Sequence, residues 1–422
     1  MSFGNGRVCE MEVLVLKLNA IQVLAMACFG AAMGLWLKRN LSILDRLNIP
    51  ASICGGLVYA LAALVLRDRF LNLEMDLTLR DILMVTFFTT IGASASLRLI
   101  RVGGIQVLWF FALATAGAVA QNALGVAVAA GTGLNPLLGL VCGSVALIGG
   151  PATALAFGGT FEELGLNGAT TVGIAAATFG IVAGGLFGGH IGASLARKHK
   201  LKPSPSSVDP GTADEAVYEE KSAADTASPF HEGAESEHSP LFQNAIVVAV
   251  AMGIGTLISV LFERLGLILP AYVGAMIAAA ALRNFDDRFG SLGISQHHLD
   301  SIGNIALQVF IVMALMTLRL WELVHLAGPM MLILVLQIGL MLVLCWVSFR
   351  LMGRDYDAAV MAGGYCGFGL GTTANAMACM DVVVKKYGPA PRAFIVIPLV
   401  GAFLIDFTNA LLITLFMNLT RP

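Results

Sequence analysis

The sequence predicts an all-α polytopic membrane protein made of two inverted repeats of five transmembrane helices, each repeat with a re-entrant helical hairpin. The prediction depends on the composition, on ten long apolar stretches and on two apolar segments that glycines interrupt. Of the 422 residues, 57% are hydrophobic and only 12% are charged, whereas about 25% of residues are charged in typical soluble proteins. The net charge of −2 provides no basic surface for DNA or RNA, so we exclude nucleic-acid binding.

An apolar helix needs about 20 residues to cross the lipid bilayer. Apolar stretches of about this length lie at 14–37, 50–66, 80–97, 104–130 and 168–195 in the first half, and at 243–262, 269–283, 301–319, 327–350 and 390–418 in the second. Between the halves, residues 199–240 are rich in Pro, Ser and charged residues, a composition typical of a flexible, solvated linker. We therefore expect a first repeat at 1–198, a linker at 199–240 and a second repeat at 241–422.

Two further apolar segments cannot form continuous helices. Residues 136–160 are interrupted by Gly149-Gly150-Pro151, and residues 357–382 by Gly367, Gly369 and Gly371. Because a helix does not run smoothly through such sequences, we expect each segment to form two half-helices that enter and leave the membrane on the same side. The order of elements is then the same in both halves, and an odd number of crossings per repeat inverts the second repeat. Inverted repeats are typical of secondary transporters.

The distribution of basic residues predicts the orientation. With the N-terminus outside, 17 of the 25 Lys and Arg residues fall on the cytoplasmic side. The positive-inside rule therefore favours both termini outside and a cytoplasmic linker.

Broken helices can bind charged solutes inside a membrane, because unwound carbonyls ligate cations and half-helix N-termini attract anions. Candidate substrate-binding residues are Gly150, Pro151, Ala152 and Thr153 at the first break, and Gly369, Gly371, Thr372, Thr373 and Asn375 at the second. Candidate sodium ligands are Gly149, Asn122, Cys366, Gly367 and Asp406. The alternative is that the glycines only permit close helix packing, as we expect for Gly180, Gly184, Gly188 and Gly192.

Asp406 lies midway through the last apolar stretch, where an ionisable group is costly unless it is paired. Asn409 follows three residues later on the same helical face. An ionised Asp406 could bind a substrate ammonium group or a sodium ion, and Asn409 could add an amide oxygen; the alternative is a protonated or helix-pairing aspartate. For Gln121 and Asn122, hydrogen bonding between helices and ligand contact are equally compatible with the pattern.

The chain contains no HExxH, GxSxG or GxxxxGK[ST] signature, and no catalytic or metal-binding pair emerges from the spacing of histidines and cysteines. We therefore predict that the protein is not an enzyme and has no catalytic residues. A channel and a sodium/proton exchanger remain alternatives to a symporter.

Several long motifs in order resemble the bacterial sodium/glutamate symporter family. They are RDILMVTFFTTIG (80–92), QNALG (121–125), NPLLGLVCGS (135–144), ATFGIVAGGLFGG (177–189), YDAAVMAGGYCGFGLGTT (356–373) and VGAFLIDFTNAL (400–411). The resemblance implies sodium-coupled uptake of L-glutamate into the cell by a homodimer in the bacterial inner membrane. It also implies an elevator-type alternating-access mechanism, with sodium as the coupled ion.

The chain departs from this family at two positions. Pro151-Ala152 stand where the family commonly has His-Gly after the two glycines, and Tyr365 stands where a histidine precedes Cys366. The loss of both imidazoles leaves another carboxylate or amino acid as an alternative substrate.

Overall fold

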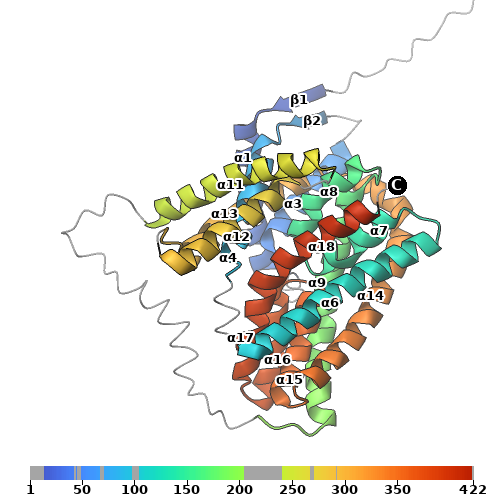
Figure 1. The fold of residues 1–422 in the computed structure, drawn as a ribbon. Coiled ribbons are helices and arrows are strands. Elements are labelled where there is room, and N and C mark those ends of the chain that lie inside the picture. Colours follow the sequence, from blue (N-terminus) through green and yellow to red (C-terminus); the bar gives the residue numbers. More distant parts are fainter. Residues whose placement is uncertain are drawn as a thin grey trace, which may run out of the picture.

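The computed structural model describes residues 14–41, 44, 49–66, 71–96, 104–203, 240–266, 270–290 and 292–420. These residues are mostly helical (Figure 1). Six helices are long and apolar enough to span a bilayer: Ala20–Asn40, Gly104–Gly131, Ala169–Lys198, Pro240–Arg264, Gln296–Met316 and Leu326–Leu351. The expected linker falls mostly at 204–239, outside the described residues.

The first half contains helices at all five expected stretches. They are α1 (Ala20–Asn40), α3 (Ala51–Leu66), α4 (Thr78–Ser94), α6 (Gly104–Gly131) and α9 (Ala169–Lys198), and the interrupted segment forms α7 (Pro136–Leu140), η1 (Val141–Val145) and α8 (Gly150–Glu163). One boundary prediction is wrong, because residues 14–18 form a strand rather than the start of a helix. This strand, β1 (Leu14–Leu18), pairs in parallel with β2 (Leu71–Met75), and Asn19 then caps α1 by accepting the Gln22 amide.

The second half contains helices at all five expected stretches. Its helices are α11 (Pro240–Arg264), α12 (Ala271–Phe289), α13 (Gln296–Met316), α14 (Leu323–Leu351, after the short η2, Leu320–Glu322), the pair α15 (Tyr356–Gly369) and α16 (Thr373–Tyr387), and α17 (Pro391–Leu399), η3 (Val400–Leu404) and α18 (Ile405–Leu419). The last three run on as one length of helix with a π turn at its centre. The π turn ends two residues before Asp406.

The helices form two groups. In the first, α3 packs on α13, α4 packs on α12 and α13, and α1 and α11 cover the outside. In the second, α9 packs against α15 and α16, α18 packs against α6, and α14 packs against α6 and α15 (Figure 1). One junction between the groups is aromatic, since the rings of Phe157 in α8 and Tyr272 in α12 lie 5.2 Å apart, edge to face.

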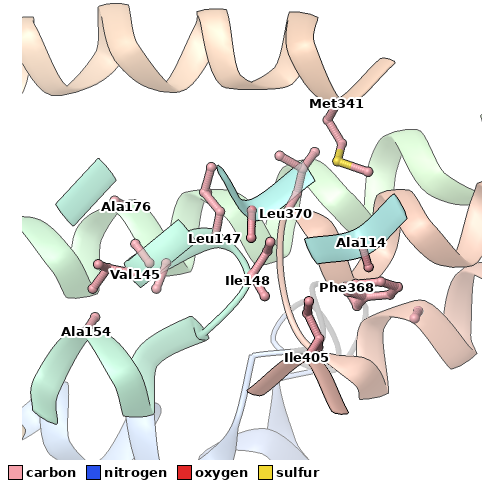
Figure 2. Close-up of a cluster of buried hydrophobic side chains, with 14 of the residues drawn as sticks. Ala114, Val145, Leu147, Ile148, Ala154, Ala176, Met341, Phe368, Leu370 and Ile405 are labelled. Carbon is pink, nitrogen blue, oxygen red and sulfur yellow. The ribbon is translucent and has the colours of Figure 1, made fainter. Parts of the chain in front are cut away.

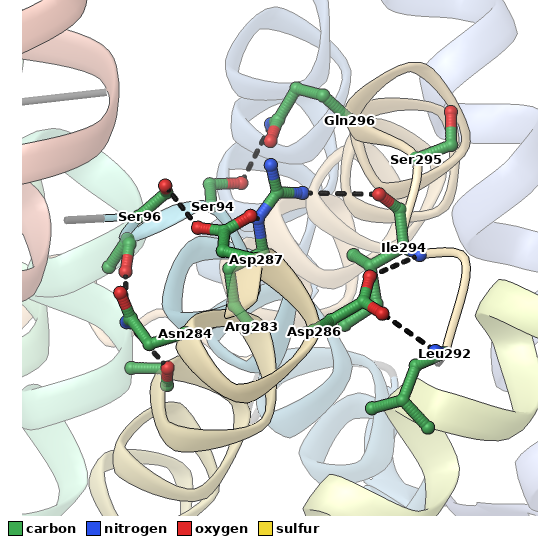
Figure 3. Close-up of polar contacts among 12 residues, drawn as sticks. Ser94, Ser96, Arg283, Asn284, Asp286, Asp287, Leu292, Ile294, Ser295 and Gln296 are labelled. Atoms are coloured by element: carbon green, nitrogen blue, oxygen red, sulfur yellow. Dashed lines mark hydrogen bonds and ion pairs between the residues drawn. The ribbon is translucent and has the colours of Figure 1, made fainter. Parts of the chain in front are cut away.

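A polar network fixes one end of the first group (Figure 3). The Asp286 carboxylate accepts hydrogen bonds from the amides of Leu292 (2.6 Å), Gly293 (3.3 Å) and Ile294 (2.9 Å). Nearby, Arg283 pairs with Asp287 at 3.0 Å, Asp287 accepts the Ser96 hydroxyl, and Gln296 donates to the Ser94 hydroxyl. The network therefore joins α12 and the turn before α13 to the end of α4.

Candidate functional site

The first interrupted segment breaks at two places. α7 continues into the single π turn η1, within which Gly143 leaves helical geometry (φ −93°, ψ −135°). The chain is helical again to Leu147, turns at Ile148 and Gly149, and continues as α8 from Gly150, which has a left-handed φ of +64°. The turn thus lies at the predicted glycine–proline sequence, and the kink at Gly143 was not predicted. Pro151 occupies the first turn of that helix, as expected, because proline lacks the amide hydrogen that is unused there.

The second interrupted segment turns at Leu370, Gly371 and Thr372, between α15 and α16. Gly369 is the last residue of α15 and Thr373 the first of α16. Gly367 does not interrupt the helix, contrary to expectation: it lies inside α15, where an added Cβ would approach the Ala376 Cα to 2.5 Å. Its small size lets the two half-helices pack closely.

The turn at Ile148–Gly149 and the turn at Leu370–Thr372 form the tips of the two interrupted segments, and these tips lie against each other. A Cβ added to Gly150 would lie 3.3 Å from the Thr372 Cγ2 and 3.8 Å from the Gly371 carbonyl oxygen. Figure 2 shows Leu147 and Ile148 of the first turn beside Leu370 of the second. The structure therefore brings together most of the predicted tip residues, including the buried Pro151, Ala152 and Thr153 and the half-buried Thr372 and Thr373.

This arrangement gathers four helix ends of two kinds. The N-termini of α8 and α16 carry unpaired amide hydrogens and the positive end of the helix dipole, which attract anions. The C-termini of α7–η1 and α15 present carbonyl oxygens and the negative end, which attract cations. One location can therefore accommodate both an anion and a cation without a charged side chain at the tips.

Asp406 provides a carboxylate on α18, the helix that packs against η1 of the first interrupted segment. The side chain is half-buried and forms no hydrogen bond or ion pair with the residues that the structure describes. Asn409, on the same face of α18, is fully buried, and its amide nitrogen donates to the Ser144 carbonyl oxygen at 3.1 Å. α18 thus connects directly to the break in the first segment.

Buried amides surround the broken segments. Asn122 Oδ1 accepts the Ser144 amide at 2.9 Å, and Gln121 Nε2 donates to the Gly369 carbonyl at 2.7 Å. Of the two possibilities for these residues, helix-to-helix hydrogen bonding is thus observed. Gln337 in α14 donates in turn to the Gln121 carbonyl at 2.7 Å.

Ser144 and Gln337 were not among the predicted site residues. Ser144 ends one of the family motifs, and Gln337 is an isolated polar residue in an apolar stretch, so each carried a signal.

Asn375 and Cys366 are the remaining predicted site residues. Asn375 is buried, and its amide nitrogen donates to the Ile181 carbonyl of α9 at 2.9 Å and to the Gly367 carbonyl at 3.4 Å. Cys366 is also buried.

The expected packing role of the α9 glycine row is confirmed. An added Cβ would lie 2.8 Å from Asn375 Nδ2 at Gly184 and 2.8 Å from the Gly363 carbonyl at Gly188.

Tyr365, one of the two departures from the family pattern, lies one helical turn before the second turn, where a Cβ added to Gly369 would be 3.6 Å from Tyr365 Cε2. Its ring lies between Phe110 (5.4 Å) and Phe368 (5.1 Å), and its hydroxyl donates to the Leu113 carbonyl at 3.4 Å. Pro151, the other departure, lies at the tip itself. Of the two, Pro151 is therefore better placed to affect a ligand.

A cavity of about 570 Å³ lies where α8 meets α4 and α13. Arg80, Glu162 and Arg319 are among its lining residues, together with Leu155 and Gly159 of α8. The cavity follows α8 away from the tip and carries charge of both signs.

Apolar membrane-spanning helices around a central pair of broken helices are the architecture of a membrane transporter. The family model described as "Sodium/glutamate symporter" matches residues 16–389. Proteins named sodium/glutamate symporter from Escherichia coli (strain K12) and Shigella flexneri are each 37% identical over 407 residues, covering 95% of this chain and 98% of the relative. The protein of that name from Haemophilus influenzae is 33% identical over 402 residues, covering 94% and 96%.

The chain therefore belongs to the sodium/glutamate symporter family. The family resemblance noted in the sequence is confirmed. The protein is accordingly a transporter rather than an enzyme.

Proposed function

We propose that the protein is a secondary active transporter that couples inward sodium movement to uptake of L-glutamate. The observation that carries the proposal is the convergence of two broken helical segments beside Asp406, in a chain of this family. The relatives' names state both sodium and glutamate. The four helix ends supply positions for an anionic amino acid and a cation at one location.

We assign the glutamate carboxylates to the N-termini of α8 and α16. The backbone from Gly150 to Thr153 and the hydroxyls of Thr153, Thr372 and Thr373 provide donors there. The ammonium group would pair with Asp406, which has no partner among the described residues. This pairing explains why a carboxylate is kept in the middle of an apolar helix despite its cost.

The proposed transport mechanism is alternating access of the elevator type. In this proposal α6–α9 and α14–α18 form the mobile domain that carries the tips, and α1, α3, α4 and α11–α13 form the scaffold. Support comes from the separation of the helices into these two groups. The cavity between α8 and the scaffold helices is the proposed outer entrance, where Arg80 and Arg319 would attract an anion.

Two inverted repeats with re-entrant hairpins remain part of the proposal. Support comes from pairs of matching contacts between the halves. The contact of α3 with α13 has its counterpart in the contact of α12 with α4. The contact of α9 with the α15–α16 hairpin has its counterpart in the contact of α18 with α7 and η1. A two-fold pseudo-symmetry axis would relate these pairs.

We place the protein in the bacterial inner membrane, with both termini outside and the linker in the cytoplasm, because 17 of its 25 basic residues then face the cytoplasm. The homodimer remains a proposal from the family resemblance.

A different carboxylate or amino acid is the second candidate substrate, and Pro151 favours it. This residue lies in the first turn of α8, where the family resemblance implies a histidine. Replacing an imidazole by a pyrrolidine ring removes a hydrogen-bonding group next to the proposed carboxylate position.

Purified protein in proteoliposomes tests the substrate assignment. Under an inward sodium gradient, we expect labelled glutamate uptake to be inhibited by unlabelled glutamate much more strongly than by glutarate, which lacks the ammonium group. In Asp406→Asn this preference should collapse, whereas Asp381→Asn, an exposed position on α16, should retain it. Unchanged uptake and unchanged preference in Asp406→Asn would show that Asp406 is not part of the site. Stronger inhibition by another acid than by glutamate would assign that acid as the substrate.

A further inference from the structure

Three buried polar side chains meet at the break in the first segment. Ser144, Asn122 and Asn409 are each at most 1% exposed and come from η1, α6 and α18. The Ser144 backbone amide donates to Asn122 Oδ1 at 2.9 Å, and its carbonyl oxygen accepts from Asn409 Nδ2 at 3.1 Å. The side chains of Asn122 and Asn409 thus hold the Ser144 backbone from both sides.

These hydrogen bonds fix which atom of each amide is engaged. Because Asn409 uses its nitrogen on a carbonyl, its Oδ1 is left over, and this oxygen is buried without a hydrogen-bond partner. The hydroxyl oxygen of Ser144 is also buried without a partner. The amide nitrogen of Asn122, a donor, is the third buried atom of the cluster without a partner. Each such atom costs about 1–3 kcal/mol, so three of them on residues in contact point to a ligand.

The two free oxygens have the chemistry of a hard-cation site. Amide and hydroxyl oxygens ligate cations that prefer oxygen, and Ser144 lies near the C-terminal end of the first half-helix, the negative end of its dipole. Asp406, one helical turn before Asn409, supplies negative charge on the same face of α18. Gly143 makes the close approach possible, because a Cβ there would lie 2.8 Å from Asn122 Oδ1.

We propose that a sodium ion binds to Ser144 Oγ and Asn409 Oδ1, with Asn122 as a positioning residue that holds the Ser144 backbone. This inference rests on the proposed sodium-coupled transport and assigns the ion to residues behind the first tip, rather than to Gly149, Cys366 and Gly367. A cation at this position would neutralise charge beside the substrate before the loaded domain moves. The site would thereby couple sodium to substrate.

The sodium concentration that gives half-maximal glutamate uptake measures this site. In Ser144→Ala and Asn409→Ala we expect this concentration to rise about 10- to 100-fold, because each variant removes an oxygen ligand of a charged group. The KM for glutamate at saturating sodium should change much less. Ser348→Ala removes an equally buried, unpartnered hydroxyl from α14 and should leave the sodium dependence unchanged.

A second readout does not require transport. In detergent without glutamate, sodium replacing choline should raise the Tm of the wild-type protein, and the variants should need correspondingly more sodium for the same rise. Ser144→Thr retains the hydroxyl and should stay close to wild type, which separates loss of the ligand from loss of packing.

The outcomes distinguish this inference from the proposed function. If the wild-type protein shows sodium-driven glutamate uptake and Ser144→Ala and Asn409→Ala keep the wild-type sodium dependence in both assays, the site is refuted and the proposed function stands. If the wild-type protein shows neither sodium-driven uptake nor sodium-dependent stabilisation, both fail.

Discussion

The contact between the two tips can be tested most directly by substitution of Gly150. Its φ of +64° lies in the left-handed region, and in Gly150→Ala an L-residue there costs about 1–2 kcal/mol. The space is tight, because the added Cβ would lie 3.3 Å from Thr372 Cγ2 and Thr372 must shift by a few tenths of an ångström. We therefore expect a folded protein whose free energy of unfolding is about 1–2 kcal/mol lower, with a raised KM because the added methyl group presses on the second tip.

Gly253→Ala, in the middle of α11, is the control. Gly253 is exposed, and a Cβ there would meet nothing within 4 Å. Alanine in a helix interior is favoured over glycine by roughly 0.5–1 kcal/mol, so this variant should be slightly more stable than wild type and transport normally. SDS unfolding titrations and uptake assays on both variants provide the comparison. Equal stability and equal KM in the two variants would refute the proposed contact between the tips.

Three further predictions follow from single contacts. Asn375→Leu should lower the free energy of unfolding by about 1–3 kcal/mol, since the Ile181 carbonyl loses a buried donor; thermal unfolding measures this, and a wild-type Tm would argue against the docking of α16 on α9. Gln121→Leu removes the 2.7 Å hydrogen bond to the Gly369 carbonyl beside the second turn, so the KM for the substrate should rise by about tenfold; an unchanged KM in initial-rate assays would separate this bond from the site. Asp286→Ala leaves three amides without their acceptor and should cost about 2–4 kcal/mol of stability with an unchanged KM, because the network lies outside the tips; a changed KM at normal stability would contradict that separation.

Hydropathy predicted the positions of the helices well, because a bilayer demands long apolar segments and the chain obeys that demand throughout. The sequence did not reveal that residues 14–18 form a strand, since apolar residues before a helix look like more of the same helix and the partner strand begins at Leu71. Pairing between distant segments is not visible in local periodicity.

Local sequence patterns also could not predict the detailed structure of the two tips. Gly-Gly-Pro and GFGLG correctly indicated broken helices, but glycine marks either a break or a close contact, and Gly367 belongs to the second kind. The break at Gly143 depends on Asn122, which holds the next residue from a different helix. Ser144 and Gln337 were missed for a related reason: their importance comes from partners more than 20 residues away.

Sodium-driven uptake by the purified protein tests the central claim most directly. Proteoliposomes with an inward sodium gradient should accumulate labelled L-glutamate above its equilibrium distribution, and a sodium ionophore or replacement of external sodium by potassium should abolish the accumulation. Passive equilibration that never exceeds the external concentration, or sodium movement without any organic solute, would contradict the account.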